Sequence, residues 1–253
     1  MNTIMAHRGA RNIWAENSLE GFARVIEGGF TAVEFDLHLT DDGTLVAMHD
    51  AALDRTTDAT GPTRALTDAT RRNVRLKDEG GTLTGNHIPG FDEVLALFAP
   101  HPAITLYVEL KSDADDRPYA GMTAKVVAAL RARGMMDRVW LHSFDINVVR
   151  EIRDLAPTVP RMISVNTAWA DKQGGLGAFL DSVDDLVEVV GVHHALFTAE
   201  RDLLRARLGM ERISLWTLNT PDLMRAMAAE GPRFLVSDDP FLLRDTLAEG
   251  VAP

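Results

Sequence analysis

Short apolar runs rich in β-branched residues alternate with stretches of helical periodicity along the whole chain. The expected strands cover residues 3–7, 31–39, 105–111, 139–144, 161–165, 188–193, 212–218 and 234–237. The expected helices cover residues 18–28, 91–98, 120–133, 146–155, 199–208, 221–230 and 240–249. Glycine or proline at positions 28–29, 134, 157, 209 and 231–232 marks the ends of these segments.

Eight strands, nearly all followed by a helix, favour a (β/α)8 TIM barrel. A barrel of this type needs about 250 residues, and the chain has 253. The rival architecture is a doubly wound open sheet. No Gly-x-Gly-x-x-Gly turn follows the first strand, which weakens the dinucleotide-binding form of that rival. We therefore expect an α/β protein in which residues 1–253 form a single TIM-barrel domain.

One segment breaks the alternation of strand and helix. Asp41-Asp42-Gly43-Thr44 separates the second strand from another apolar run, and this connection is too short to start a new parallel strand. Residues 44–49 should therefore fold back antiparallel on the second strand, with Asp42-Gly43 at the centre of the turn. That register sets His49 opposite Asp36, or one position away from it if the register slips.

The polar stretch at residues 51–87 is rich in threonine and punctuated by glycine, with one weak helical piece near residues 67–74. Loops of this length inside a compact domain are usually functional or disordered. We expect residues 41–88 to form a small insertion after the second strand, a β-hairpin and loop that caps the barrel mouth.

Composition restricts the classes of partner. Hydrophobic residues make up 46% of the chain, which is ample for one large core. The 37 acidic residues outnumber the 26 basic ones, and the formal net charge of −11 argues against binding to nucleic acid or to an anionic membrane. A small phosphate-bearing substrate remains compatible, because a few local cations suffice to bind it.

The chain has no cysteine, so neither disulfides nor thiolate chemistry can contribute. No apolar run approaches the roughly 20 residues of a membrane span. The first residues lack the basic and apolar segments of a signal peptide. These patterns predict a cytoplasmic protein without a membrane span, and they do not indicate an oligomeric state.

Acidic side chains alternate with apolar ones along the second strand. Glu34 and Asp36 share one face of this strand, and a barrel strand is covered on both sides, so that face should point into the barrel at its open end. Close carboxylates are costly unless a cation binds or a proton is shared. Glu109 ends the next parallel strand and can join them, which predicts an oxygen site for Mg²⁺ or Ca²⁺. Alternatively, Glu109 forms only a strand-end ion pair with Lys111.

Two histidine motifs flank these carboxylates. His7-Arg8-Gly9 closes the first strand, and His49-Asp50 follows the hairpin. Two histidines can act as acid and base near neutral pH, and Arg8 suits a bidentate grip on phosphate. Gly9 would let the backbone approach a ligand, while Asp50 either orients a histidine or starts a turn. Acid, base and metal together are what cleavage of a phosphodiester requires.

Other polar strand ends carry weaker signals. Trp216 either lines a pocket against an apolar part of the substrate or fills the core, and Asp238 ends the eighth strand at the barrel mouth. The pair His193-His194 is interpreted as a polar strand end, and His142 and His87 as structural or surface residues. An aminohydrolase would require His-x-His at the end of the first strand, where this chain has His7-Arg8-Gly9.

The chain resembles the glycerophosphodiester phosphodiesterase family, the glycerophosphoryl diester phosphodiesterases, through motifs in order over nearly its whole length. These motifs are His7-Arg8-Gly9, Glu16-Asn17-Ser18, Glu34-Phe35-Asp36, Leu39-Thr40-Asp41-Asp42-Gly43, His49-Asp50, Leu53-Asp54-Arg55-Thr56-Thr57, Ile88-Pro89, Glu109-Leu110-Lys111, Ser143-Phe144 and Trp216-Thr217-Leu218-Asn219. There are two mild departures. Ser18 stands where such chains commonly have threonine, and Phe234-Leu235-Val236-Ser237-Asp238 replaces the more usual Ile-Thr-Asp ending.

The resemblance implies a TIM barrel and metal-dependent hydrolysis of glycerophosphodiesters to sn-glycerol 3-phosphate and an alcohol. By position, it implies that the metal is held by Glu34, Asp36 and Glu109. It also implies an acid–base pair formed by His7 and His49, and a phosphate held by Arg8 and Lys111.

Two alternatives stay open. A related two-histidine barrel would act as a phospholipase D-like phosphodiesterase on a lysophospholipid or sphingolipid, although the polar insertion gives little sign of the apolar groove that such substrates need. A barrel that binds a phosphodiester without cleaving it is the second alternative. The sequence distinguishes neither Mg²⁺ from Ca²⁺, nor the acid histidine from the base, nor the alcohol released.

Overall fold

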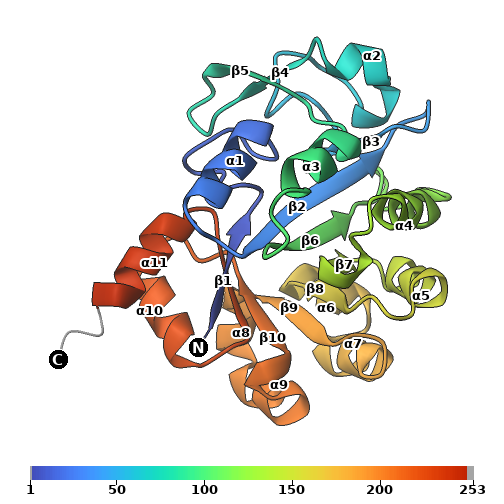
Figure 1. The fold of residues 1–253 in the computed structure, drawn as a ribbon. Helices are drawn as coiled ribbons and strands as arrows, with labels where there is room; N and C mark the ends of the chain where they lie inside the picture. The colour runs from blue at the N-terminus through green and yellow to red at the C-terminus, as the bar shows by residue number, and fades with distance from the viewer. Residues whose placement is uncertain (1, 250–253) are drawn as a thin grey trace.

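Eight parallel strands close on themselves in the computed structural model, which describes residues 2–249. They are β1 (Thr3–His7), β2 (Ala32–Leu39), β6 (Thr105–Leu110), β7 (Val139–Ser143), β8 (Arg161–Val165), β9 (Val189–His193), β10 (Ile213–Trp216) and β11 (Phe234–Ser237). Each pairs with its neighbour in this order, and β1 pairs with both β2 and β11, which closes the ring (Figure 1). The predicted (β/α)8 barrel is confirmed, and every expected strand is found within a few residues of its predicted bounds.

Helices surround the barrel on the outside (Figure 1). They are α1 (Leu19–Glu27), α3 (Phe91–Phe98), α4 (Met122–Ala132), α5 (Ile146–Leu155), α6 (Thr167–Lys172), α7 (Leu176–Val183), α8 (His194–Ala199), α9 (Arg201–Leu208), α10 (Pro221–Ala229) and α11 (Pro240–Glu249). The sequence did not predict α6, α7 and α8. Two of them are only six residues long, and Gly174-Gly175 interrupts the periodicity between α6 and α7.

The barrel interior has two levels. The lower level is apolar and is formed by Met5, Ala32, Tyr107, Trp140, Met162, Val189, Phe234 and Val236, which pack against one another. Side chains two positions further along a strand point to the same side. In β2, β6 and β7 those positions hold Glu34, Glu109 and His142, so ionisable groups lie directly above an apolar floor.

The hairpin after β2 forms as predicted, but its register is shifted by one residue. Strand β3 (Leu45–Ala47) pairs antiparallel with β2, and Leu37 lies opposite Ala47. The loop has three residues, Asp41 to Gly43, because the Thr40 amide bonds the Thr44 carbonyl and Gly43 adopts a φ of 87°. Met48 therefore lies opposite Asp36, and His49 lies one position further on.

The remainder of the expected insertion folds on its own small core. It contains the 3-10 turn Thr63–Ala65, helix α2 (Asp68–Arg71) and the antiparallel pair β4 (Arg75–Lys77) and β5 (Leu83–His87). Its apolar cluster consists of Ala15, Val46, Met48, Leu53, Leu66, Leu76 and Ile88. Figure 1 shows α2, β4 and β5 at one edge of the barrel, beside α1, α3 and β3.

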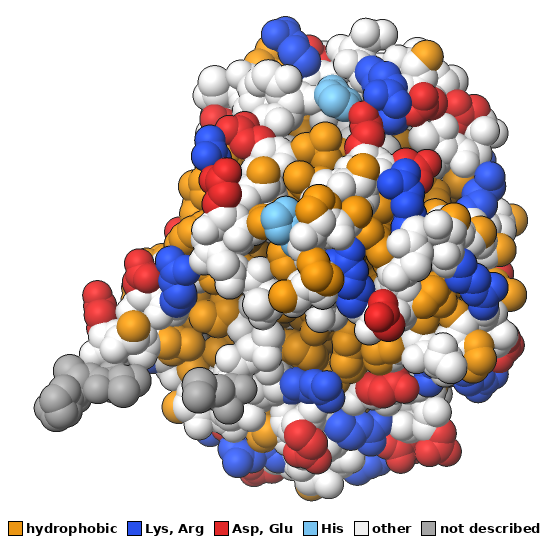
Figure 2. Space-filling model, in the orientation of Figure 1, with side chains coloured by type: hydrophobic (Ala, Val, Ile, Leu, Met, Phe, Trp, Pro, Cys, Tyr) orange, Lys and Arg blue, Asp and Glu red, His pale blue; other side chains and the backbone are white. Residues whose placement is uncertain are grey.

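The surface carries charge without a large single-sign patch on the face seen in Figure 2, where acidic and basic side chains are interspersed. Many of these side chains form ion pairs, such as Arg24 with Glu27 and Arg205 with Glu230. Among residues 2–249, no helix has both the length and the apolar character needed to cross a membrane.

Candidate active site

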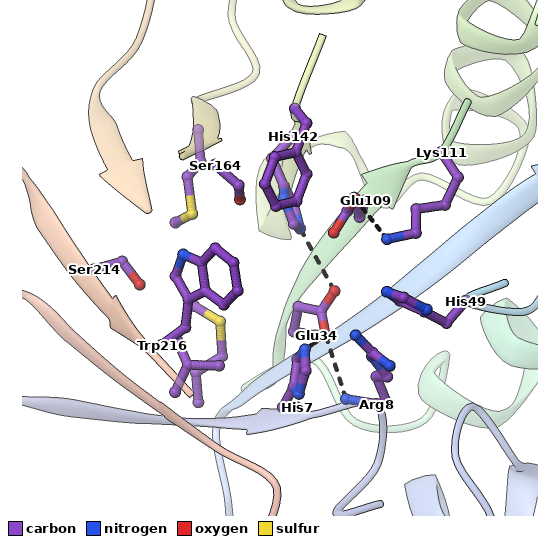
Figure 3. A pocket seen from close by; sticks show the side chains of 14 residues that line it. His7, Arg8, Glu34, His49, Glu109, Lys111, His142, Ser164, Ser214 and Trp216 are labelled. Atoms are coloured by element: carbon purple, nitrogen blue, oxygen red, sulfur yellow. Dashed lines mark hydrogen bonds and ion pairs between the residues drawn. The ribbon is translucent and has the colours of Figure 1, made fainter. Parts of the chain in front are cut away.

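A cavity opens at the carboxyl ends of the barrel strands. It is lined by Met5, His7, Arg8, Glu34, His49, Glu109, Lys111, His142, Phe144, Met162, Ser164, Ser214, Trp216 and Val236. Figure 3 shows Glu34 near the centre, with His7 and Arg8 on one side of it and His142 on another. The structure therefore brings together all of the predicted site residues except Asp36, which lies buried behind Arg8 and Lys111.

Asp36 is fully buried and held by three side chains. Asn17 donates a 2.9 Å hydrogen bond from Nδ2 to Asp36 Oδ2, and Arg8 Nε lies 3.2 Å from the same oxygen. Lys111 Nζ lies 3.2 Å from Asp36 Oδ1 and donates a 2.8 Å hydrogen bond to Glu109. The predicted Glu109–Lys111 ion pair is therefore present in the same place as the predicted carboxylate cluster.

The three carboxylates differ in their pKa because their neighbours differ. Burial, together with the nearby Asp36 and Glu109, raises the pKa of Glu34 well above its usual value. Burial would also raise the pKa of Asp36, but Lys111 and Arg8 outweigh it and hold that pKa well below the usual range. Burial is likewise outweighed at Glu109, where Lys111 lowers the pKa. Glu34 is therefore the carboxylate whose charge lacks compensation.

The arrangement of donor atoms fits a small cation. Within residues 2–249, Glu34 Oε1 is buried and has no hydrogen-bond partner, whereas Asp36 Oδ1 has Lys111 Nζ at 3.2 Å. Ligand atoms of Glu34, Glu109 and His142 all lie within 4.8 Å of one another. Buried polar atoms in native proteins are normally paired, so the unpaired Glu34 oxygen, with Glu109 and His142 close to it, suits a divalent ion.

His142 corrects the sequence interpretation, which placed it among structural or surface residues. It lies 4% exposed in the cavity wall, and its Nε2 is 3.7 Å from Glu34 Oε1. The strand register explains this position, because His142 lies directly beside Glu109 on the adjacent parallel strand. The sequence of β7 alone does not show this, because the position depends on the register between β6 and β7.

His7 is fixed by a carboxylate from the other end of the chain. Its Nδ1 lies 2.5 Å from Asp238 Oδ1, and its Nε2 is 3.7 Å from Glu34 Oε2. Asn219 Nδ2 donates a 2.7 Å hydrogen bond to the second oxygen of Asp238. Burial and the Arg8 charge lower the pKa of His7, and Asp238 opposes that shift. His7 is therefore held with one ring nitrogen free to face the cavity.

His49 also has a carboxylate partner. Its Nδ1 lies 2.7 Å from Asp50 Oδ1, and Arg55 donates a 2.6 Å hydrogen bond to Asp50. Of the two predicted roles for Asp50, the geometry favours orientation of the histidine. Arg55 is anchored in turn by two hydrogen bonds to Glu16.

His38 fixes the backbone beneath His49, a role that the sequence interpretation missed. Burial lowers the pKa of His38 to about 4, so its ring is neutral at physiological pH. Its Nε2 lies 3.0 Å from the His49 carbonyl, which can only accept. Nδ1 must therefore accept the 2.9 Å hydrogen bond from the Tyr119 hydroxyl.

The structure also shows where Trp216 and Gly9 lie. Trp216 lines the cavity and packs edge-on against Phe144 and His193, with ring centroids 5.7 Å and 5.0 Å away. Gly9 allows a close approach of the backbone to Phe22 of α1. A Cβ at Gly9 would lie 2.9 Å from the Phe22 ring.

The sequence profile of the glycerophosphoryl diester phosphodiesterase family matches residues 7–242. The chain belongs to this family. It is 25% identical over 252 residues to the glycerophosphodiester phosphodiesterase of Caldanaerobacter subterraneus subsp. tengcongensis, and the match covers 98% of both chains. The match identifies the protein as an enzyme, a phosphodiesterase acting on glycerophosphodiesters.

Solved structures support the same fold. A protein of Silicibacter pomeroyi DSS-3 superposes with a TM-score of 0.87 at 29% identity, over 99% of this chain and 94% of that one. A phosphodiesterase of Oleispira antarctica, solved in complex with the product sn-glycerol-3-phosphate, superposes with a TM-score of 0.75 at 20% identity, over 98% of this chain and 97% of that one. The architecture of this glycerophosphodiester phosphodiesterase is therefore that of its family.

Proposed function

We propose that this enzyme hydrolyses glycerophosphodiesters to sn-glycerol 3-phosphate and an alcohol, with a divalent cation and two histidines in one cavity. The observation that carries the proposal is the convergence of His7 and His49 on the cavity that holds Glu34 and Glu109. Each histidine has a carboxylate on its Nδ1, which leaves Nε2 for proton transfer. The product bound in the Oleispira antarctica relative is consistent with this reaction.

The cation would be held by Glu34, Asp36 and Glu109, as the family resemblance implies, and carboxylate oxygens are the ligands that Mg²⁺ and Ca²⁺ prefer. These three carboxylates face two cationic side chains, Arg8 and Lys111, so one negative charge is uncompensated. When bound, a divalent ion would offset that charge and leave one excess positive charge, which matches the single negative charge of a phosphodiester.

The two histidines differ in depth, which suggests their roles. His7 is 12% exposed beside Glu34, whereas His49 is 29% exposed. His49 also lines a wider groove at the mouth, which shares Glu109, Lys111 and Phe144 with the inner cavity. We assign His7 as the base that takes the proton from the attacking hydroxyl or water. His49 is assigned as the acid that protonates the departing alcohol on the solvent side.

The remaining predicted residues would bind the substrate. Arg8 and Lys111 line the cavity with their cationic groups and would hold the phosphate. Trp216 would contact the carbon atoms of the glycerol. The insertion, residues 41–88, carries His49 and Asp50, so it would form one wall of the barrel mouth and supply half of the acid–base pair.

The test is an assay of glycerol 3-phosphate released from glycerophosphocholine and glycerophosphoethanolamine. The protein is first stripped of metal and then assayed with and without Mg²⁺, Ca²⁺ or Mn²⁺. Metal-dependent release is the expected result and would rank the two head groups. Absence of product with every ion would overturn the proposal, and choline released from lysophosphatidylcholine would favour the lipid-acting alternative instead.

A further inference from the structure

His142 is a buried imidazole that makes no hydrogen bond within the described part of the chain. It projects from β7 into the cavity, and neither of its ring nitrogens has a hydrogen-bond partner among the described residues 2–249 (Figure 3). The closest acidic atom, Glu34 Oε1, lies 3.7 Å from Nε2, which is too long for a hydrogen bond. A structural histidine in a protein interior would normally satisfy at least one of its nitrogens.

His142 Nε2 is close enough to Glu34 Oε1 for both atoms to bind the same ion. Two atoms bound to one ion at about 2.0–2.3 Å can lie at most about 4.6 Å apart. The Nε2 to Oε1 distance of 3.7 Å is inside that limit. The ligand atoms of Glu34, Glu109 and His142 lie within 4.8 Å of one another, so only a small side-chain adjustment is needed for all three to reach one ion.

We infer that His142 supplies a nitrogen ligand to the cation held by Glu34 and Glu109, an inference that rests on the metal dependence proposed above. Imidazole binds Mn²⁺, Co²⁺ and Zn²⁺ readily, whereas Ca²⁺ and Mg²⁺ prefer oxygen. The site is therefore built for a mixed nitrogen and oxygen ligand set. His142 raises its affinity for the transition ions and contributes little to its affinity for Ca²⁺.

His7 is the alternative source of nitrogen, because its Nε2 lies 3.7 Å from the other Glu34 oxygen. Its Nδ1 is bound to Asp238, which holds the ring against β11 on the opposite side of Glu34 from His142 (Figure 3). The group of mutually close ligand atoms contains His142 and Glu109. His7→Gln is therefore the matched control for His142→Gln.

The first measurement is pulsed electron paramagnetic resonance of Mn²⁺ bound to the wild-type enzyme, with natural and ¹⁵N-labelled histidine. We expect modulation from a directly bound histidine nitrogen, which changes on ¹⁵N labelling, persists in His7→Gln and disappears in His142→Gln. This reads the ligand atom itself and does not depend on turnover. Mn²⁺ binding without histidine modulation, or modulation lost only in His7→Gln, would overturn the inference and leave the metal dependence standing.

The second measurement is titration calorimetry of the metal-free proteins with Zn²⁺, Co²⁺ and Ca²⁺. In His142→Gln the affinities for Zn²⁺ and Co²⁺ should fall at least about tenfold, while the Ca²⁺ affinity stays within about threefold of the wild type. Retained Ca²⁺ binding also shows that the variant is folded. Equal losses for all ions, or none, would overturn the inference, and a wild-type protein that binds no divalent ion would overturn the proposed metal dependence as well.

Discussion

The imidazole of His7 and the carboxylate of Asp238 are 2.5 Å apart although 231 positions separate them in the sequence. The closure of the barrel produces this contact, because β1 and β11 pair in parallel with Ala6 beside Ser237. The next residues along the two strands are His7 and Asp238, and both stand at the open end of the barrel. The first and last strands therefore supply a histidine and the carboxylate that orients it.

Replacing Asp238 by asparagine should disturb the tautomer of His7. Asp238 accepts one hydrogen bond from Asn219 on Oδ2, while Oδ1 faces His7 Nδ1. In Asp238→Asn, one of these contacts must bring two donors together, or His7 must adopt the opposite tautomer. We expect kcat to fall by roughly 10²–10⁴. Asp239→Asn, which retains the cap on Leu242, should remain close to wild type.

The same substitution should move the pH profile. Burial and Arg8 lower the pKa of His7, and the Asp238 charge raises it. Removal of that charge lowers the His7 pKa further, because the imidazolium form loses its partner. If His7 is the base, the acidic limb of the kcat/KM profile shifts to lower pH. An acidic limb that stays in place would contradict the role assigned to His7.

The assigned roles of the two histidines make opposite predictions for substrates with different leaving groups. A glycerophosphodiester of an acidic phenol needs no proton on the departing oxygen, whereas one of an aliphatic alcohol does. His49→Ala should lose on the order of 10²–10⁴ in rate with the aliphatic ester and recover most of it with the phenol ester. His7→Ala should stay slow with both. Recovery of His7→Ala instead would exchange the two roles.

Sequence patterns were sufficient for the barrel and for most of the cavity. The apolar runs located the eight strands, and parity along β2 placed Glu34 and Asp36 on the inner side, where both are buried. The Asp42-Gly43 turn correctly predicted that the hairpin places His49 at the cavity, although the register of the hairpin is shifted by one residue. That shift depends on whether the turn has two or three residues, and an Asp-Gly pair is compatible with both lengths.

The residues that were misread or missed act through partners elsewhere in the fold. His142 is one histidine at a strand end, and only its register beside Glu109 distinguishes it from a structural residue. Likewise, His38 shares the face of Glu34 and Asp36, but its role depends on Tyr119 and on the His49 carbonyl. Alternation along one strand does not specify such contacts, which follow from the packing of several elements.

Gly9 and Gly29 allow backbone strain to be separated from close packing. Both have positive φ, 72° and 77°, but a Cβ at Gly29 meets open space while one at Gly9 lies 2.9 Å from the Phe22 ring. Gly29→Ala should reduce the free energy of unfolding by about 1 kcal/mol from strain alone. Gly9→Ala adds overpacking against α1, for a total of about 2–4 kcal/mol. Equal losses in denaturant unfolding would contradict this packing role for Gly9.

Arg71 should make the stability of the enzyme depend on acid pH. Its side chain is 2% exposed and donates hydrogen bonds to Glu93 at 2.6 Å and to the Ile88 carbonyl at 2.9 Å, which ties α2 of the insertion to α3. Burial would raise the pKa of Glu93, but the Gly90 amide and Arg71 outweigh it and lower that pKa from 4.5 to about 2. Because the folded-state pKa is depressed, the stabilisation is complete above about pH 4.5 and is lost as the pH falls toward 2.

Arg71→Met should therefore lower the free energy of unfolding by about 2–4 kcal/mol at neutral pH, since it leaves Glu93 and the Ile88 carbonyl without their buried donor. The difference from wild type should shrink between pH 4.5 and 2, because Glu93 becomes protonated in both proteins over that range. The exposed pair of Arg24 and Glu27 is the control, and Arg24→Met should cost less than about 1 kcal/mol. A pH-independent difference between wild type and Arg71→Met would mean that Arg71 acts through the packing of its side chain alone and not through the charge of Glu93.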